Sequence, residues 1–236
     1  MKTVILAGGK GSRLLPYTTI VPKPLMPVGE KPVLEIILEQ LRSFGMEDII
    51  LTISHLGELI MAFCGDGSKF GVKIDYSWED KPLGTVGALG LVRDDLSETF
   101  LTINGDTLTD LNFLELVNYH KRNGALVTIA LKRREVHIDF GVVELDDSHL
   151  VREYIEKPVI SHTVSMGVYV FEPRVLDYIP PGESLDFPDL IRRLLARGEP
   201  VGGFVCDNYW WDMGRPEDFR KANEEADGIL ARLGLD

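Results

Sequence analysis

Cysteine is scarce in this sequence, and long hydrophobic runs are missing. The 236 residues include two cysteines, Cys64 and Cys206, which show neither a pairing motif nor a metal-binding spacing. We therefore expect a reducing compartment, with both thiols acting as small apolar core residues. The apolar run at the N-terminus spans five residues before Gly8, too short for a signal peptide or a membrane span. The sequence predicts a cytoplasmic protein with no membrane partner.

Positive charge is also in short supply. The chain has 25 Lys and Arg against 37 Asp and Glu, which gives a net charge of -12 and a pI near 4.9. Proteins that bind nucleic acid usually present a basic face, so we expect no nucleic-acid partner. Any site that binds a polyphosphate must therefore be a small basic region on an otherwise acidic protein. The five histidines show no metal spacing and have no partner serine or cysteine.

Apolar runs that alternate with amphipathic stretches predict parallel strands joined by helices. The expected strands are 3–7, 48–53, 72–77, 99–103, 125–131, 141–145, 151–155 and 165–171, and the expected helices are 33–44, 55–64, 87–92, 113–122, 187–197 and 216–232. The short, closely spaced strands after residue 132 indicate added antiparallel pieces. No linker, repeat or low-complexity segment divides the chain. We therefore expect one α/β domain over residues 1–236, a Rossmann-like doubly wound fold with a mixed sheet.

A glycine-rich segment follows the first expected strand. Residues 6–14 read LAGGKGSRL, and glycines there let backbone N–H groups turn toward an anion. Leu14 stands where the dinucleotide fingerprint has its third glycine, and no Walker A lysine follows at the required offset. A phosphate-binding loop of another kind and an ordinary surface loop both remain open at this point.

Arg13 and Lys23 flank a proline-rich stretch, with prolines at 16, 22, 24 and 27. Such a stretch is expected to follow an extended path, which would carry both cations back over the glycine loop. The forked guanidinium donors and the compact ammonium charge could together neutralise a polyphosphate. The alternative is a solvated loop with two ordinary basic residues.

Several short motifs occur in a characteristic order along the chain. They are LAGGKGSRLLPYTTIVPKPL from Leu6, GTVGAL from Gly84, NGD ending at Asp106, FGVV from Phe140, EKP from Glu156, GVY from Gly167 and WDMG from Trp211. Together they resemble the sugar nucleotidylyltransferases. Within that family, the motif sequences are most similar to those of members related to mannose-1-phosphate guanylyltransferase and glucose-1-phosphate nucleotidylyltransferase. The resemblance implies transfer of a nucleoside monophosphate from an NTP to a sugar 1-phosphate, with release of pyrophosphate. It also implies a chain without the C-terminal β-helix of longer relatives.

Two aspartates are the expected metal ligands. Asp106 follows the strand 99–103, at the edge where open α/β sheets bind ligands, and Asp212 lies between an aromatic run and a helix. Each alone could be a helix cap or a turn residue. The resemblance implies that both converge on Mg²⁺. The attacking phosphate would then need positioning and charge neutralisation rather than a protein nucleophile. The expected catalytic residues are Arg13, Lys23, Asp106 and Asp212.

The resemblance also assigns the binding residues. The expected nucleotide contacts are Leu6, Ala7, Gly8, Gly9, Gly11, Ser12, Arg13, Pro82, Gly84, Thr85 and Gly105. The expected sugar-phosphate contacts are Lys23, Gly141, Glu156, Lys157 and Gly167. Glu79 could accept from an amino-bearing base edge such as that of guanine, or it could be an exposed solvated acid. The cluster Tyr209-Trp210-Trp211 could be a sugar platform or core packing behind Asp212.

The identity of the substrates stays open. The segment PLGTVGAL favours GTP as the nucleotide and a mannose- or heptose-type sugar 1-phosphate as the second substrate. The family often has Tyr where Phe140 stands, and Asn-Ala or Asn-Gly where Ser165-Met166 stand, and these departures leave the sugar undetermined. Alternatives are a dTTP- or UTP-dependent glucose-1-phosphate nucleotidylyltransferase, a cytidylyltransferase acting on an alcohol phosphate, and a non-catalytic nucleotide-sensing subunit. Relatives often form dimers or tetramers, so a homo-oligomer is compatible with the sequence.

Overall fold

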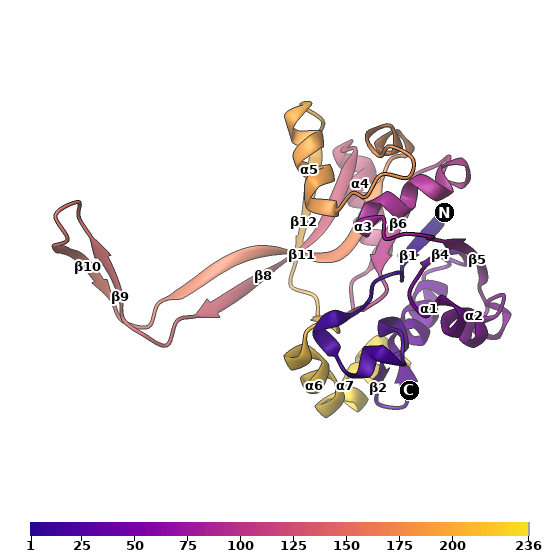
Figure 1. The fold of residues 1–236 in the computed structure, drawn as a ribbon, viewed down its shortest axis with the longest axis horizontal. Coiled ribbons are helices and arrows are strands. Elements are labelled where there is room, and N and C mark those ends of the chain that lie inside the picture. Colours follow the sequence, from indigo (N-terminus) through magenta and orange to yellow (C-terminus); the bar gives the residue numbers. More distant parts are fainter. Residues whose placement is uncertain (236) are drawn as a thin grey trace.

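A seven-stranded mixed sheet forms the centre of the molecule in a computed structural model that describes residues 1–235 (Figure 1). The strand order is β12-β8-β11-β6-β1-β4-β5, and β11 runs antiparallel to both of its neighbours. The other neighbouring pairs are parallel. The expected α/β fold with a mixed sheet is confirmed. The bounds are β1 (Lys2–Leu6), β4 (Asp48–Ile53), β5 (Lys73–Trp78), β6 (Phe100–Asn104), β8 (Val127–His137), β11 (Val159–Phe171) and β12 (Val201–Cys206).

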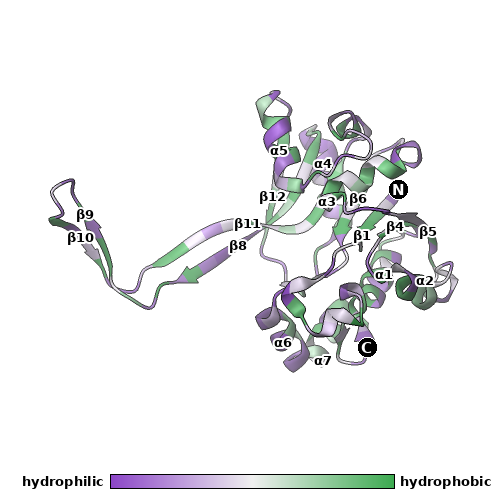
Figure 2. Ribbon diagram, in the orientation of Figure 1, coloured by the Kyte–Doolittle hydropathy of each residue, from purple (hydrophilic) through white to green (hydrophobic). Residues whose placement is uncertain are grey.

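Helices cover both faces of the sheet and enclose two apolar cores. In β1 the side chain of Ile5 packs into one core and that of Val4 into the other, as the strand alternation requires. The central strands therefore contribute apolar side chains to both cores, and their ribbons are largely in the hydrophobic colour in Figure 2. The first core takes residues from α1 (Val33–Ser43), α2 (Gly57–Cys64), α4 (Phe113–Asn123), α6 (Pro216–Glu224) and α7 (Ala226–Leu233), and the second from α3 (Gly84–Gly87) and α5 (Phe187–Ala196).

Local sequence signals fix the ends of the helices. The side chain of Asn112 accepts a hydrogen bond from the Glu115 amide at 3.1 Å and begins α4. Gly124 ends the same helix with a φ of 62°, a left-handed conformation that glycine adopts without a steric penalty. A side-chain cap at one end and a glycine at the other therefore fix the boundaries of α4.

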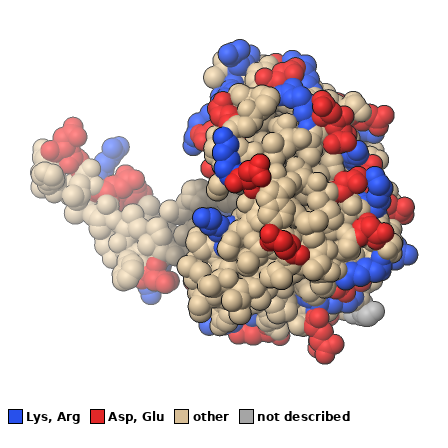
Figure 3. Space-filling view, turned by 45° about the vertical axis from the view of Figure 1, so that its right-hand side comes forward, with Lys and Arg blue, Asp and Glu red and all other residues tan. Residues whose placement is uncertain are grey.

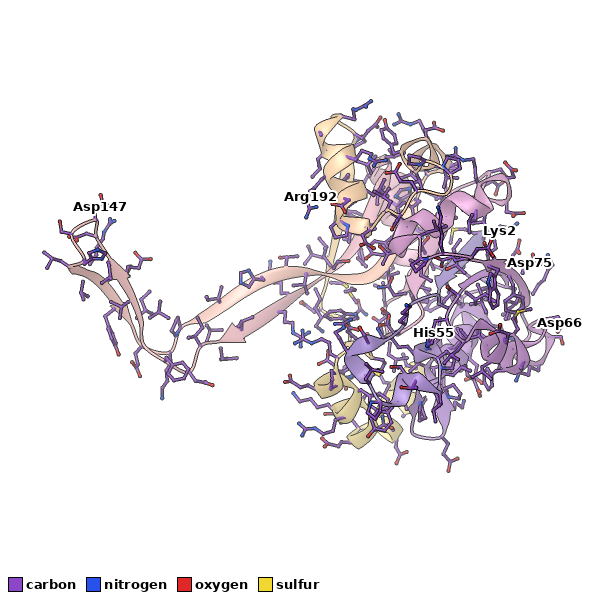
Figure 4. All side chains as sticks on the ribbon, viewed as in Figure 1. Lys2, His55, Asp66, Asp75, Asp147 and Arg192 are labelled. Carbon is purple, nitrogen blue, oxygen red and sulfur yellow. The ribbon has the colours of Figure 1, made fainter. Side chains whose placement is uncertain are left out.

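A long β-ribbon leaves the body of the molecule and ends in a hairpin (Figure 1). The ribbon is the outer part of β8 and β11, and the hairpin consists of β9 (Val142–Leu145) and β10 (Val151–Ile155). Asp147, at the turn of the hairpin, lies far from the body (Figure 4). We call residues 132–164 the arm. The sequence predicted antiparallel strands in this region but not their projection away from the body.

Two pairs of short strands complete the fold. β2 (Pro27–Val28) pairs with β3 (Lys31–Pro32), and β7 (Thr107–Thr109) pairs with β13 (Trp210–Asp212), both antiparallel. The second pair joins the segment after β6 to the segment that precedes α6. It therefore connects two regions that are distant in the sequence.

Three expectations about local structure are wrong. The proline-rich stretch is not extended but forms 3₁₀ turns at Ser12–Leu14, Tyr17–Thr19 and Lys23–Leu25, because the φ of proline also suits such turns. The helix expected over 216–232 is interrupted at Glu225, whose φ is -111°. The helix expected over 87–92 is a 3₁₀ segment, Ala88–Asp95, that follows the short α3.

Charged side chains of both signs are interspersed over the face of the molecule shown in Figure 3. No single-sign patch dominates that face. Among residues 1–235, no helix has the length and apolar character that crossing a bilayer requires.

Candidate active site

A cavity of about 520 Å³ opens at the carboxyl ends of β1 and β6. This is the edge at which open α/β sheets bind ligands. The cavity is lined by loops that follow these strands, by the middle part of β11 and by β13. The residues expected from the sequence that line it are Leu6, Ala7, Gly8, Gly9, Arg13, Lys23, Pro82, Gly84, Thr85, Gly105, Asp106, Gly167 and Asp212.

The glycine loop begins where β1 ends and is held by backbone hydrogen bonds. The amide of Ala7 donates to the Thr52 carbonyl, and that of Gly105 donates to the Leu6 carbonyl, each at 2.9 Å. Gly11 has a φ of 63°, and a Cβ there would lie 2.8 Å from Thr18 Cγ2. Gly11 thus shapes the loop, although neither it nor Ser12 lines the cavity.

The two aspartates lie side by side because β7 and β13 form one ladder. Asp212 is paired with Thr107, and the amide of Met213 donates to the Asp106 carbonyl at 2.9 Å. The Asp212 carboxylate also accepts from the Gly214 amide at 2.9 Å. Both aspartates line the cavity. The structure therefore brings together two acids that are far apart in the sequence.

Each aspartate faces a cation. The ammonium of Lys23 forms an ion pair with Asp106, and Arg13 Nη1 lies 3.7 Å from Asp212 Oδ2. Burial lowers the pKa of Lys23 to about 8, although the nearby Asp212 charge acts to raise it. Two positive and two negative groups thus meet at one wall of the cavity. Phosphate oxygens and a divalent cation could exchange with these partners.

Gly214 leaves room for both cations. A Cβ at this position would overlap the Lys23 ammonium and lie 2.9 Å from Arg13 Nη2. The space beside Asp212 is therefore occupied by charged groups, and any side chain at residue 214 would displace them. The sequence signal was the glycine of the WDMG motif, but its packing role could not be inferred from the motif.

Glu79 lies in the cavity wall, which makes the expectation of an exposed, solvated acid wrong. The residue is 7% exposed, and its Oε2 accepts from the Leu83 amide at 3.1 Å. A Cβ at Gly8 would lie 2.5 Å from Glu79 Oε1, so the carboxylate approaches the glycine loop closely. Burial raises the pKa of Glu79. The site therefore holds a buried acceptor beside the first glycines.

Asp186 is a lining residue that the sequence analysis missed. Its Oδ1 accepts from the Thr85 amide at 3.0 Å, and Thr85 Oγ1 accepts from the Phe187 amide at 2.7 Å. These bonds tie the loop at Gly84 to the start of α5. No local signal identifies such a contact, because it joins residues about a hundred positions apart. An aspartate before an apolar helix reads only as a helix cap.

Three of the expected sugar-phosphate residues lie on the arm and do not line the cavity. Gly141 faces the Tyr154 ring, and the Tyr154 hydroxyl donates to Glu156 Oε2 at 3.0 Å. Lys157 has a φ of 46°, at the bend between ribbon and hairpin. The role expected for these residues stays a prediction. Gly167, in contrast, lines the cavity, and a Cβ there would lie 2.6 Å from Asn104 Nδ2.

All three residues of the aromatic cluster pack against the first core, and one of them also lines the cavity. Trp210 lines the cavity, and its indole N–H donates to the Met166 carbonyl at 2.9 Å. Trp211 packs edge-on against Tyr209, with ring centroids 5.5 Å apart. Core packing is therefore confirmed for the cluster, and its role as a sugar platform stays a prediction.

The model of the nucleotidyl transferase family matches residues 2–227 of the chain. The match contains the glycine loop, both aspartates and the whole cavity. The chain belongs to the nucleotidyl transferase family. It is 38% identical to UTP–glucose-1-phosphate uridylyltransferase of Synechocystis, over 98% of the chain and 64% of the relative. It is 37% identical to mannose-1-phosphate guanylyltransferase of Mycobacterium tuberculosis, over 94% of the chain and 63% of the relative.

A solved structure shares the fold of this chain. HddC from Yersinia pseudotuberculosis, complexed with GMP-PN, superimposes with a TM-score of 0.73 at 26% identity, over 95% of the chain and 99% of HddC. The chain spans just under two thirds of the length of the two curated relatives.

Proposed function

We propose that the protein transfers a nucleoside monophosphate from an NTP to a sugar 1-phosphate and releases pyrophosphate. The observation that carries this proposal is the presence of the glycine loop, Arg13, Lys23, Asp106 and Asp212 around one cavity. A phosphate oxygen of the sugar 1-phosphate attacks the α-phosphorus in line, and the bond to the bridging oxygen of pyrophosphate breaks. No protein nucleophile is needed, so positioning and charge neutralisation carry the rate.

The cations divide the phosphates between them. Arg13, which is exposed beside the glycine loop, binds the β- and γ-phosphates and stabilises the leaving pyrophosphate. The more deeply buried Lys23 binds near the α-phosphate, where negative charge develops during attack. The backbone at Gly8 and Gly9 approaches the ribose and base, because no Cβ stands in the way.

Asp106 and Asp212 have the chemistry of magnesium ligands. They are neighbouring carboxylates in the cavity, and Mg²⁺ usually takes one or two carboxylates together with substrate phosphate oxygens and waters. Within residues 1–235, no group of three or more His, Cys, Asp and Glu side chains could hold a metal ion by itself. This agrees with a metal that shares its ligands with the nucleotide. When bound, Mg²⁺ would neutralise charge on the reacting phosphates.

Glu79 supports GTP as the nucleotide. Its buried carboxylate lies beside Gly8, and a guanine edge offers two N–H groups that a carboxylate can accept. Similarity to a mannose-1-phosphate guanylyltransferase and to a structure complexed with GMP-PN favours the same base. Similarity to a UTP–glucose-1-phosphate uridylyltransferase makes UTP the second candidate.

The sugar 1-phosphate is expected to contact Gly141, Glu156 and Lys157 together with Gly167. Lys157 would hold the phosphate and Glu156 would accept from sugar hydroxyls. Because three of these residues lie on the arm, their role requires an arm to reach the cavity. A mannose- or heptose-type sugar is the candidate substrate.

A matrix of GTP, UTP, dTTP, CTP and ATP against mannose, heptose, glucose, galactose and N-acetylglucosamine 1-phosphates tests the proposal. The reaction is run with Mg²⁺ and scored by NDP-sugar and pyrophosphate. We expect a GDP-sugar as the main product. Nucleotide binding without product for any pair would contradict the transfer reaction and support the nucleotide-sensing alternative. A UDP-sugar as main product would overturn the assignment of the base and leave the reaction in place.

A further inference from the structure

The arm carries an apolar face that nothing in the protomer covers. Cross-strand pairing places Val143 opposite Tyr154 and Leu145 opposite Val151, so these four side chains share one face of the hairpin. Their exposures are 43%, 62%, 53% and 66%. A two-stranded hairpin without a supporting layer is only marginally stable in water. An apolar face of this kind indicates a contact with another surface.

The ribbon holds this hairpin away from the cavity of its own protomer. Seven consecutive residue pairs join the two strands, from Ser165 and Leu131 to Val159 and His137, and the amide of Ile138 continues the pairing to the Pro158 carbonyl. The ribbon therefore spans roughly 20 Å. Ser165 lines the cavity, so the ribbon starts at the cavity and leads outward. Bringing the hairpin back to the same cavity would require this ladder to bend back or break.

We propose that the arm completes the active site of a second copy of the chain. In this arrangement two copies exchange arms around a two-fold axis, and the hairpin of each covers the cavity rim of the other. The apolar face is then buried by the same contact that delivers Glu156 and Lys157 to a cavity. A closed, reciprocal exchange of this kind is a common route to symmetric dimers. The inference rests on the proposed function for the roles of these two residues.

The partner is a second copy rather than an unrelated protein because the hairpin combines two properties. It presents an apolar docking face, and it carries Glu156 and Lys157, which the proposed function assigns to the sugar 1-phosphate and which do not line the cavity of their own protomer. Only a surface next to a sugar-phosphate site would contact the apolar face and also place these polar residues beside a substrate. In its own protomer the hairpin could reach such a site only if the ladder of the ribbon bent back or broke.

Mixed dimers test the exchange. Lys157→Ala and Asp106→Asn are co-expressed with different affinity tags, and dimers that carry both tags are isolated. Each parent variant alone should be strongly impaired. In the mixed dimer one site combines an intact cavity with an intact arm, so we expect about half of the wild-type rate. A mixed dimer no more active than its parents would show that each arm serves its own cavity, and an unimpaired Lys157→Ala would remove the arm from the site. Both outcomes overturn the inference.

Sedimentation provides a test that does not depend on activity. Leu145→Ser should convert the wild-type dimer to monomer, because it polarises the centre of the apolar face. Leu195→Ser is the matched control, since Leu195 is 60% exposed but lies on α5 in the body, and it should leave the dimer intact. Tryptophan fluorescence checks that both variants are folded. A monomeric wild-type protein, or a dimer that survives Leu145→Ser, would contradict the proposal. If the wild type dimerises through Leu145 but forms no NDP-sugar, the proposed function fails and the arm contact stands.

Discussion

The body and the arm of the molecule differ in how their apolar side chains are covered. Phe100 and Phe171 in the body are fully buried and stack with ring centroids 5.3 Å apart. In the arm, Phe140 is 77% exposed and Leu150 is 66% exposed. The body is therefore stabilised by a core on each face of the sheet, whereas the arm is held by backbone pairing and a few side-chain hydrogen bonds. The comparison shows that the same two strands, β8 and β11, are buried in the body at one end and exposed to solvent in the arm at the other.

Removal of a buried ring should give the largest effect and separates the two environments most sharply. Phe171→Ala is expected to lower the free energy of unfolding by about 3–5 kcal/mol, because it leaves a cavity in the second core. Phe140→Ala is the matched change in the arm and should cost less than about 0.5 kcal/mol. Urea unfolding followed by tryptophan fluorescence measures both, since all three tryptophans lie in the body. Equal losses would mean that the arm is packed as tightly as the core.

Neutralising either acid of the cavity should lower turnover by about 100-fold, because a carboxylate that would hold Mg²⁺ is lost and the negative charge of the reacting phosphates is then less well neutralised. The variants are Asp106→Asn and Asp212→Asn, with Asp147→Asn in the arm turn as a control of unchanged activity. Initial rates of NDP-sugar formation provide the measurement, and circular dichroism checks the fold. Wild-type rates in either cavity variant would refute the metal assignment.

Gly214→Ala should raise the KM for the nucleotide about tenfold. Its Cβ would push the Lys23 ammonium and the Arg13 guanidinium away from their positions beside the acids. Gly228→Ala serves as the control, because a Cβ at Gly228 would meet nothing within 4 Å. Steady-state kinetics with varied nucleotide distinguishes the two. An unchanged KM in Gly214→Ala would mean that neither cation contacts the nucleotide in the place observed.

The smallest effect is expected at Glu79. Glu79→Gln should weaken GTP binding about threefold to tenfold relative to UTP, because an amide accepts with one oxygen only. Since burial raises the pKa of Glu79, the wild-type carboxylate gains its proton at a higher pH than an ordinary glutamate. GTP affinity should therefore be full above that raised pKa and fall as the pH drops through it.

Calorimetric titration across pH measures the effect, with Asp80→Asn as the exposed neighbouring control. In Glu79→Gln the decline with falling pH should disappear. A wild-type affinity for GTP that stays constant at low pH would argue that this carboxylate does not contact the base.

Much of the body could be predicted from the sequence because its elements are set by local patterns. The apolar run 48–53 became β4 with the expected bounds, and the helix expected over 113–122 became α4, which ends one residue later. β12 was missed because Gly202 and Gly203 make the strand look like a loop. The expected C-terminal helix breaks at Glu225, where no proline or glycine indicates an interruption.

The cavity was partly predictable, because its phosphate-facing residues lie in compact motifs. The burial of Glu79 and the contact of Asp186 with Thr85 arise from packing between distant segments, which no local pattern records. The position of the arm was beyond reach for a different reason. Its strands satisfy their pairing whether or not they contact the body.

The short ladder between β7 and β13 sets the position of Asp106 relative to Asp212. This relative position therefore depends on the C-terminal segment, which contains β13. Asn223 ties α6 to the region after the glycine loop, through its side-chain bonds with Gly29 N at 3.2 Å and the Pro27 carbonyl at 3.1 Å. A chain cut before Tyr209 would lose Asp212 and also the strand that aligns Thr107. Asp106 would then remain in the sequence without the backbone partner that orients it.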